Sequence, residues 1–256
     1  MTEPRAKMRQ AGVLGGMGPE ATLAFLEKFY ALTRGRREQA RPALLVNIEP
    51  GVPDRNEAWS GIGVSPADAL AQMGRKLKQA GADFCVMACV TAHGYVESFE
   101  SDVGIPLIRM PDVVADYLRP ERREGSPEKP QRGDAGQTAA TDDSPVGLLA
   151  TTTTLEMKLF QAAFAARNCP LVLPDKIGQE ALMRAIYAIK KGEEARSIIL
   201  AVAKSLVARG ARRLLLGCTD LSVLSPVSLE GCTVVDALEL LAQRTLAEIE
   251  TGSRIG

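Results

Sequence analysis

Histidine is almost missing from this chain of 256 residues, because His93 is the only one. Metal sites built from several histidines are therefore excluded, and at most one nucleophile can be assisted by an imidazole. A net charge is missing as well, since 31 lysines and arginines balance 31 aspartates and glutamates. Without an excess of either sign, the protein has no overall electrostatic attraction to nucleic acid or to a membrane surface.

Long apolar runs are also absent. No segment approaches the roughly 18 consecutive apolar residues of a membrane span. Residues 2–7 are charged and lack the apolar centre of a signal peptide. The five cysteines are odd in number and two lie inside apolar runs, so a disulfide framework is not expected. We therefore expect a reduced, cytoplasmic protein that binds neither nucleic acid nor membranes.

The rest of the composition is that of a globular protein with one large or two small domains, with 46% hydrophobic and 24% charged residues. Apolar strands and amphipathic helices alternate along the chain, which favours parallel α/β sheets. Proline, glycine and charge dominate residues 119–145, which predicts a surface insertion there. The expected strands are 13–14, 43–48, 84–88, 105–108, 146–149, 171–173, 214–216 and 234–235.

Two stretches repeat. Residues 81–89 align without gaps on residues 210–218, and residues 12–16 resemble residues 147–151. In the first pair, each copy is a glycine that ends a helix, an apolar strand and then a cysteine, Cys89 or Cys218. The repeat indicates two related α/β halves, each of which ends a strand in a thiol.

Ligands bind beyond the carboxyl ends of strands in open α/β sheets, so both thiols occupy candidate positions. If the halves face each other, Cys89 and Cys218 can remove a proton from one face of a carbon and return one to the other. The alternative is that each is a small buried residue. Thr91 and Thr219 can bond a thiolate or a carboxylate, and His93 either transfers a proton or bonds the local backbone.

Two cations are further candidates. Arg55 lies in a proline-bounded loop after a strand, where an arginine can clamp a carboxylate; a local ion pair with Asp54 is equally compatible. Lys190 ends a helix, a position that the helix dipole alone also favours. Residues 16–21 fit the dinucleotide-binding pattern G-x-G-x-x-A after a strand. The ribose-binding acid expected about 20 residues later is missing, since Glu38 does not end a strand, but an NAD(P)-binding oxidoreductase remains an alternative.

Together these motifs resemble the cofactor-independent aspartate/glutamate racemases, over nearly the whole chain except residues 119–145. The matching segments are Gly-Gly-Met-Gly-Pro-Glu-Ala-Thr at 15–22, Pro-Asp-Arg at 53–55, Cys-Val-Thr-Ala-His at 89–93, Val-Gly-Leu-Leu-Ala-Thr at 146–151, the lysine segment 186–192 and Gly-Cys-Thr-Asp at 217–220.

The resemblance implies two pseudo-symmetric α/β domains with parallel four-stranded sheets and an active-site cleft between them. Residues 1–112 with 230–256 would form the first domain and 113–229 the second, with the last helix packed on the first domain. It implies a homodimer that uses no cofactor and acts on an amino acid or dicarboxylate. Cys89 and Cys218 would be the catalytic bases. The expected substrate-binding residues are Met17, Gly18, Arg55, Thr91, Thr151, Thr153, Lys190 and Thr219, with His93 and Asp220 behind them.

Two positions depart from the family pattern. Val90 stands where the family has asparagine, and Arg109 stands where it often has histidine. Both departures bear on the substrate. They leave open a related isomerase or decarboxylase on the same fold, or a small-molecule binder without catalysis.

Overall fold

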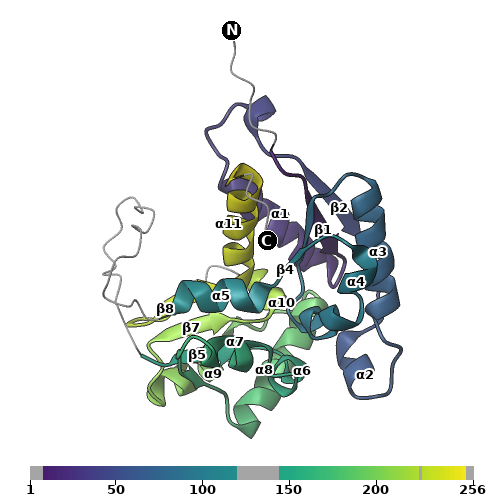
Figure 1. The fold of residues 1–256 in the computed structure, drawn as a ribbon. Coiled ribbons are helices and arrows are strands. Elements are labelled where there is room, and N and C mark those ends of the chain that lie inside the picture. The colour runs from purple at the N-terminus through teal and green to yellow at the C-terminus, as the bar shows by residue number, and fades with distance from the viewer. Residues whose placement is uncertain (1–7, 120–143, 225–226, 252–256) are drawn as a thin grey trace.

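The computed structural model describes residues 8–119, 144–224 and 227–251 (Figure 1). Two parallel four-stranded sheets form the centres of two halves, as the sequence predicts. The first sheet has the order β2 (Leu44–Ile48), β1 (Ala11–Gly15), β3 (Phe84–Met87) and β4 (Leu107–Ile108). The second has the order β6 (Leu171–Val172), β5 (Val146–Leu149), β7 (Arg213–Leu216) and β8 (Thr233–Asp236).

The internal repeat holds at the level of single residues. The central strands β3 and β7 coincide under the alignment of 81–89 with 210–218. Gly12 of β1 and Gly147 of β5 are equivalent, and each leaves no room for a side chain. A Cβ at Gly12 would lie 3.1 Å from the Cβ atoms of Leu77 and Ala82, and one at Gly147 would lie 3.1 Å from those of Leu206 and Ala211. These neighbours are themselves aligned pairs, so the helix before each central strand approaches its sheet in the same way.

Helices cover the faces of both sheets. Pro19 and Glu20 begin α1 (Pro19–Ala31), because proline fits the first turn and an acid is favourable at its positive end. In α3 (Ala67–Gln79), the buried residues Leu70, Met73 and Leu77 recur at helical spacing. The others are α2 (Arg55–Trp59), α4 (Glu100–Val103), α5 (Met110–Leu118), α6 (Thr152–Glu156), α7 (Leu159–Ala165), α8 (Lys176–Lys190), α9 (Arg196–Ala208), α10 (Thr219–Ser222) and α11 (Ala237–Thr251), with 3-10 turns at Glu38–Ala40 and Thr91–Ser98.

Each half sends the helix that follows its last strand across to the other half. Helix α5 packs against α7, and α11 packs against α1 and α5 (Figure 1). Apolar residues of both halves consequently share one core, which includes Phe25, Phe84, Phe160 and Leu241. The crossing of the last helix agrees with the expectation. No helix in the described part of the chain has the length and apolar character needed to cross a membrane.

The predicted domain boundaries are wrong in two places. Residues 230–236 were assigned to the first domain, but β8 pairs with β7 in the second sheet, with Val235 opposite Leu215. The chain therefore crosses over only at Ala237. The boundary between 112 and 113 falls inside α5, a continuous helix whose buried face lies against α7 and α11.

Most of the predicted insertion, residues 120–143, lies outside the described residues, but its two ends are held together. Arg213 donates from Nη1 to the Leu118 carbonyl at 2.9 Å and from Nη2 to the Ser144 carbonyl at 2.8 Å. The Cys169 thiol donates to the same Leu118 carbonyl at 3.5 Å. The Arg213 guanidinium thus joins the two chain ends that flank the insertion.

Candidate active site

The two repeated cysteines line one cavity between the sheets. Cys89 follows β3 and Cys218 follows β7, so each thiol lies beyond the carboxyl end of a central strand. Other loops at the same ends complete the wall. The lining residues are Met17, Arg55, Asn56, Cys89, Val90, Thr91, Thr151, Lys190, Cys218, Thr219 and Asp220.

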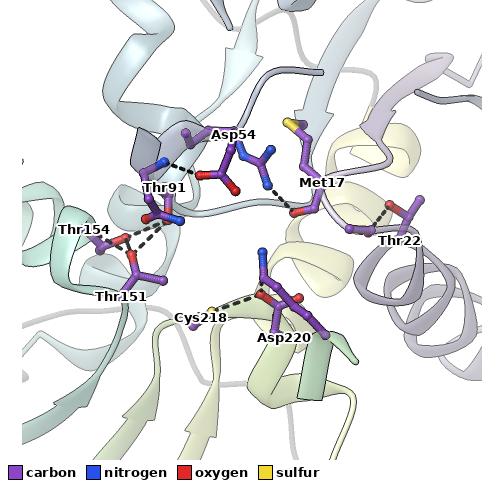
Figure 2. Close-up of polar contacts among 12 residues, drawn as sticks. Met17, Thr22, Asp54, Thr91, Thr151, Thr154, Cys218 and Asp220 are labelled. Carbon is purple, nitrogen blue, oxygen red and sulfur yellow. Dashed lines mark hydrogen bonds and ion pairs between the residues drawn. The ribbon is translucent and has the colours of Figure 1, made fainter. Parts of the chain in front are cut away.

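The Met17 loop is fixed by its glycines and by Thr22. Gly16 has a φ of +96°, and a Cβ there would collide with the backbone of Glu49. The Gly16 amide donates to Thr22 Oγ1 at 2.9 Å, and the Thr22 hydroxyl donates to the Gly18 carbonyl at 3.2 Å (Figure 2). The loop that resembles a dinucleotide fingerprint therefore brings the Met17 carbonyl to the cavity, where Arg55 binds it.

Arg55 is the buried cation of the first half. Asp54 caps the N-terminus of α2 by accepting from the amides of Asn56 at 2.7 Å and Glu57 at 3.1 Å, which aims the next residue inward. Arg55 is 7% exposed, and its guanidinium donates to the carbonyls of Val52, Pro53 and Met17 at 3.5, 3.2 and 3.3 Å. No carboxylate within the described residues forms an ion pair with it.

The charge of Arg55 is maintained by its surroundings. Burial lowers the pKa of Arg55, but its interactions with Cys89 and Asp54 outweigh burial, so that the net shift is upward. Cys89 and Arg55 line the same cavity. A negatively charged sulfur at Cys89 therefore faces a permanent cation.

His93 holds the backbone of Cys89 and is not free for proton transfer. Its Nδ1 donates to the Cys89 carbonyl at 2.8 Å, while Nε2 accepts from the Met110 amide at 3.1 Å. Burial lowers the pKa of His93 to about 4, so the ring is neutral near pH 7. Of the two interpretations of this histidine, the structure favours the bond to the local backbone.

The second thiol has the opposite environment. Cys218 Sγ donates to Asp220 Oδ2 at 3.6 Å (Figure 2), and Lys190 Nζ lies 3.6 Å from the same oxygen. Burial first, and then the charge of Asp220, raise the pKa of Cys218 well above its ordinary value. Burial also raises the pKa of Asp220, although Lys190 opposes this shift. Cys218 is thus held in its protonated form beside a carboxylate.

Lys190 remains charged in spite of its burial. Burial lowers the pKa of Lys190, but the interactions with Asp220 first, and then with Cys218 and Cys89, raise it, and the net shift is upward. The ammonium group therefore reaches the cavity as a cation that shares its charge with Asp220.

Three threonines join the halves beside the cavity. The Thr91 hydroxyl lies 3.0 Å from that of Thr151 and 3.1 Å from that of Thr154, and the Thr151 hydroxyl donates to that of Thr154 at 2.9 Å (Figure 2). Thr91 comes from the first half, whereas the other two come from the second. Their bonds hold the two halves in contact next to the thiols.

A second contact between the halves lies at the ends of α2 and α6. Trp59 Nε1 donates to Glu156 Oε2 at 2.8 Å. With both contacts formed, the cavity has a volume of about 10 Å³, roughly the space of one water molecule. A ligand of amino-acid size therefore requires the walls to separate.

The structure brings most of the predicted site together. Of the twelve predicted residues, nine line the cavity and three do not. Gly18 supports the Met17 loop, Thr153 is buried in α6, and His93 bonds the Cys89 carbonyl. Arg109 does not reach the cavity either, because it pairs with Glu100 at 2.7 Å.

Sequence reasoning missed Asn56 and Thr154. Asn56 was hidden because α2 is a five-residue helix with no apolar periodicity, so nothing indicated which side chains it turns inward. Thr154 was present in the predicted threonine-rich turn, but its contact with Thr91 crosses between the halves. In the described residues, no group of three or more histidines, cysteines, aspartates or glutamates is placed to hold a metal ion.

The fold agrees with comparisons to known proteins. A family model described as Asp/Glu/Hydantoin racemase matches residues 14–125 and 133–245. The chain belongs to this family. An uncharacterized protein from the pnlA 3′ region of Pectobacterium carotovorum subsp. carotovorum is 34% identical over 105 residues, which cover 40% of this chain and 70% of that protein.

Solved racemase structures share the fold. An aspartate racemase from Picrophilus torridus is 26% identical, with a TM-score of 0.75 over 95% of this chain and 94% of that one. A glutamate racemase from Bacillus anthracis is 14% identical, with a TM-score of 0.65 over 96% and 83% of the two chains. Family and fold together support an isomerase of the amino-acid racemase type.

Proposed function

We propose that this protein racemises aspartate, glutamate or both, and that Cys89 and Cys218 are the two bases of a 1,1-proton transfer. The observation that carries the proposal is that two thiols from equivalent strand ends line one cavity together with a buried arginine that forms no ion pair with a carboxylate of the described residues. A second cation, Lys190, lies in the same cavity.

The environments of the thiols suit different roles. Cys89, which lines the cavity together with Arg55, acts as the base and takes the α-proton from one face of the substrate. Cys218, protonated beside Asp220, gives its proton to the other face. The product is the opposite enantiomer, and the two sulfurs have exchanged protonation states. The reverse reaction starts from that exchanged state.

The cations favour a substrate with two carboxylates. Arg55 has an Nε–H donor with no partner among the described residues, and a carboxylate can accept from it. Lys190 can bind the second carboxylate while it keeps its contact with Asp220. Neutral amino acids would leave one cation unmatched and should be poor substrates. Against this stands Val90, which contributes apolar surface to the same cavity.

We further propose that the reaction needs no pyridoxal phosphate, metal or nicotinamide, because two thiols in one cavity, one with Arg55 and the other beside Asp220, can supply a base and an acid. A chelator should then leave activity unchanged, and a thiol alkylator should abolish it. Turnover of a hydroxy acid with NADH would instead support the oxidoreductase. The predicted homodimer can be checked by analytical ultracentrifugation.

The deciding experiment is exchange of the α-proton with deuterated water. Wild-type protein should incorporate deuterium into aspartate or glutamate and racemise it. Cys89→Ser and Cys218→Ser should each lose about 10²–10⁴-fold in rate, the usual contribution of a positioned proton-transfer group. Cys232→Ser is the matched control, since this thiol is partly exposed and does not line the cavity.

Near-normal racemisation by Cys218→Ser would exclude the two-base mechanism. Binding of a dicarboxylic amino acid without any exchange would support the non-catalytic binder, which the apolar Val90 and the small cavity favour. Exchange or loss of carbon dioxide from another dicarboxylate would instead identify a related isomerase or decarboxylase.

A further inference from the structure

Asn56 places an unused hydrogen-bond acceptor beside the unused donor of Arg55. Its Oδ1 atom is buried and has no hydrogen-bond partner among the described residues. The same is true of Arg55 Nε. Both residues line the cavity and are neighbours at the start of α2. Buried polar atoms without partners are rare in folded proteins, and a bound ligand is one explanation for a pair of them in a cavity.

Three other polar side chains of the cavity already have partners within the protein. The Asp220 carboxylate is bound by Lys190 and by the Cys218 thiol. The hydroxyls of Thr91 and Thr151 bond to each other. Asn56 Oδ1 is thus an acceptor that a ligand can use without breaking a contact within the protein.

The free donor of Arg55 and the free acceptor of Asn56 together match the two charged groups on the α-carbon of an amino acid. An α-amino acid carries a carboxylate and an ammonium on the same carbon, so it needs a donor and an acceptor a few ångströms apart. Arg55 Nε–H supplies the donor and Asn56 Oδ1 the acceptor. Val90, on the same cavity, has no polar side-chain atom that could take either role.

We infer that Asn56 binds the α-ammonium group of the substrate through Oδ1 while Arg55 binds the α-carboxylate. The inference rests on the proposed function, because it requires an α-amino acid as substrate. With these two groups held, and the distal carboxylate at Lys190, hydrogen is the remaining substituent on the α-carbon. It then points toward one thiol in one enantiomer and toward the other thiol in its mirror image.

The test compares ligands with and without an ammonium group. Aspartate and succinate differ mainly by this group, as do glutamate and glutarate. In Asn56→Leu, which removes the amide at similar volume, the dissociation constant of the amino acid should rise about 10- to 100-fold, the size of one hydrogen bond to a charged group. The constant for succinate or glutarate should change less than about twofold. Calorimetry measures both.

Glu57→Ala is the control variant, because Glu57 is exposed on the same short helix and does not line the cavity. It should bind both ligands like wild type. Asn56→Gln keeps an acceptor on a longer side chain and should recover part of the discrimination. Thermal unfolding of each variant reports whether α2 is intact.

The outcomes separate the two proposals. Equal weakening of aspartate and succinate in Asn56→Leu, or no weakening of either, overturns the role of Asn56 while wild-type racemisation stands. If wild-type protein neither binds nor racemises a dicarboxylic amino acid, the proposed function itself fails. Selective loss of the amino acid supports both.

Discussion

The Arg55 guanidinium offers a quantitative test of carboxylate binding. Arginine has five N–H donors, and the bonds to the carbonyls of Val52, Pro53 and Met17 use at most three of them. Nε–H has no partner among the described residues, and one hydrogen of Nη2 also remains. Two donors on one planar group match the two oxygens of a carboxylate.

The expected effect follows from that number of donors. A hydrogen bond to a charged group contributes about 1.5–3 kcal/mol, so two contribute about 3–6 kcal/mol. Arg55→Ala should therefore lower kcat/KM for a dicarboxylic amino acid by about 10²–10⁴-fold. Arg55→Lys keeps the charge but not the planar fork, and it should lose about 10- to 100-fold.

The assay is circular dichroism of aspartate or glutamate as the enantiomer excess decays, with denaturant unfolding measured in parallel. Unfolding matters because Arg55 also bonds three backbone carbonyls, so some stability is lost in either variant. Arg109→Ala is the control, since Arg109 pairs with Glu100 away from the cavity. A folded Arg55→Ala protein with kcat/KM within about fivefold of wild type would refute the reasoning.

Three further predictions concern stability. The pKa of His93 is 6.5 in the unfolded chain and about 4 in the folded protein, so the protein should lose about 3 kcal/mol of unfolding free energy as the pH falls from 6.5 to about 4. In denaturant titrations, His93→Asn should remove this dependence of stability on pH. Gly147→Ala places a Cβ 2.7 Å from Leu214 and should cost about 1–3 kcal/mol, whereas Gly51→Ala, which meets only a flexible side chain, should cost less. Replacing residues 120–143 by a short Gly-Ser linker should leave the melting temperature and activity nearly unchanged, since Arg213 already joins the flanking ends; a drop of more than about 10 °C would contradict this.

The sequence predicted the repeated parts of the fold best. The strands before Cys89 and Cys218 were located to within a residue, because a glycine stop, a wholly apolar run and a thiol occur twice in the same order. Strand β8 belongs to the second sheet, whereas the sequence predicts residues 230–256 in the first domain. Its pairing with β7 depends on register between strands separated by α10 and a loop, and two valines alone do not indicate which sheet they join.

Within the site, residue identity could be predicted but partners could not. Lys190 and Asp220 were both named, yet their contact joins the end of α8 to the start of α10. The contrast between a thiol facing a cation and a thiol facing a carboxylate therefore appears only in three dimensions. Asn56 was overlooked for the same reason, since its importance lies in an atom that lacks a partner.

The contact between Trp59 and Glu156 has a practical consequence. Trp59 is the only tryptophan of the chain, it is 47% exposed, and its indole bonds Glu156 of the other half. Any separation of the cleft walls must change the surroundings of this ring, and no other indole contributes to the emission. The protein therefore carries a built-in optical probe, through which the rate of opening can be followed by stopped-flow fluorescence without labelling.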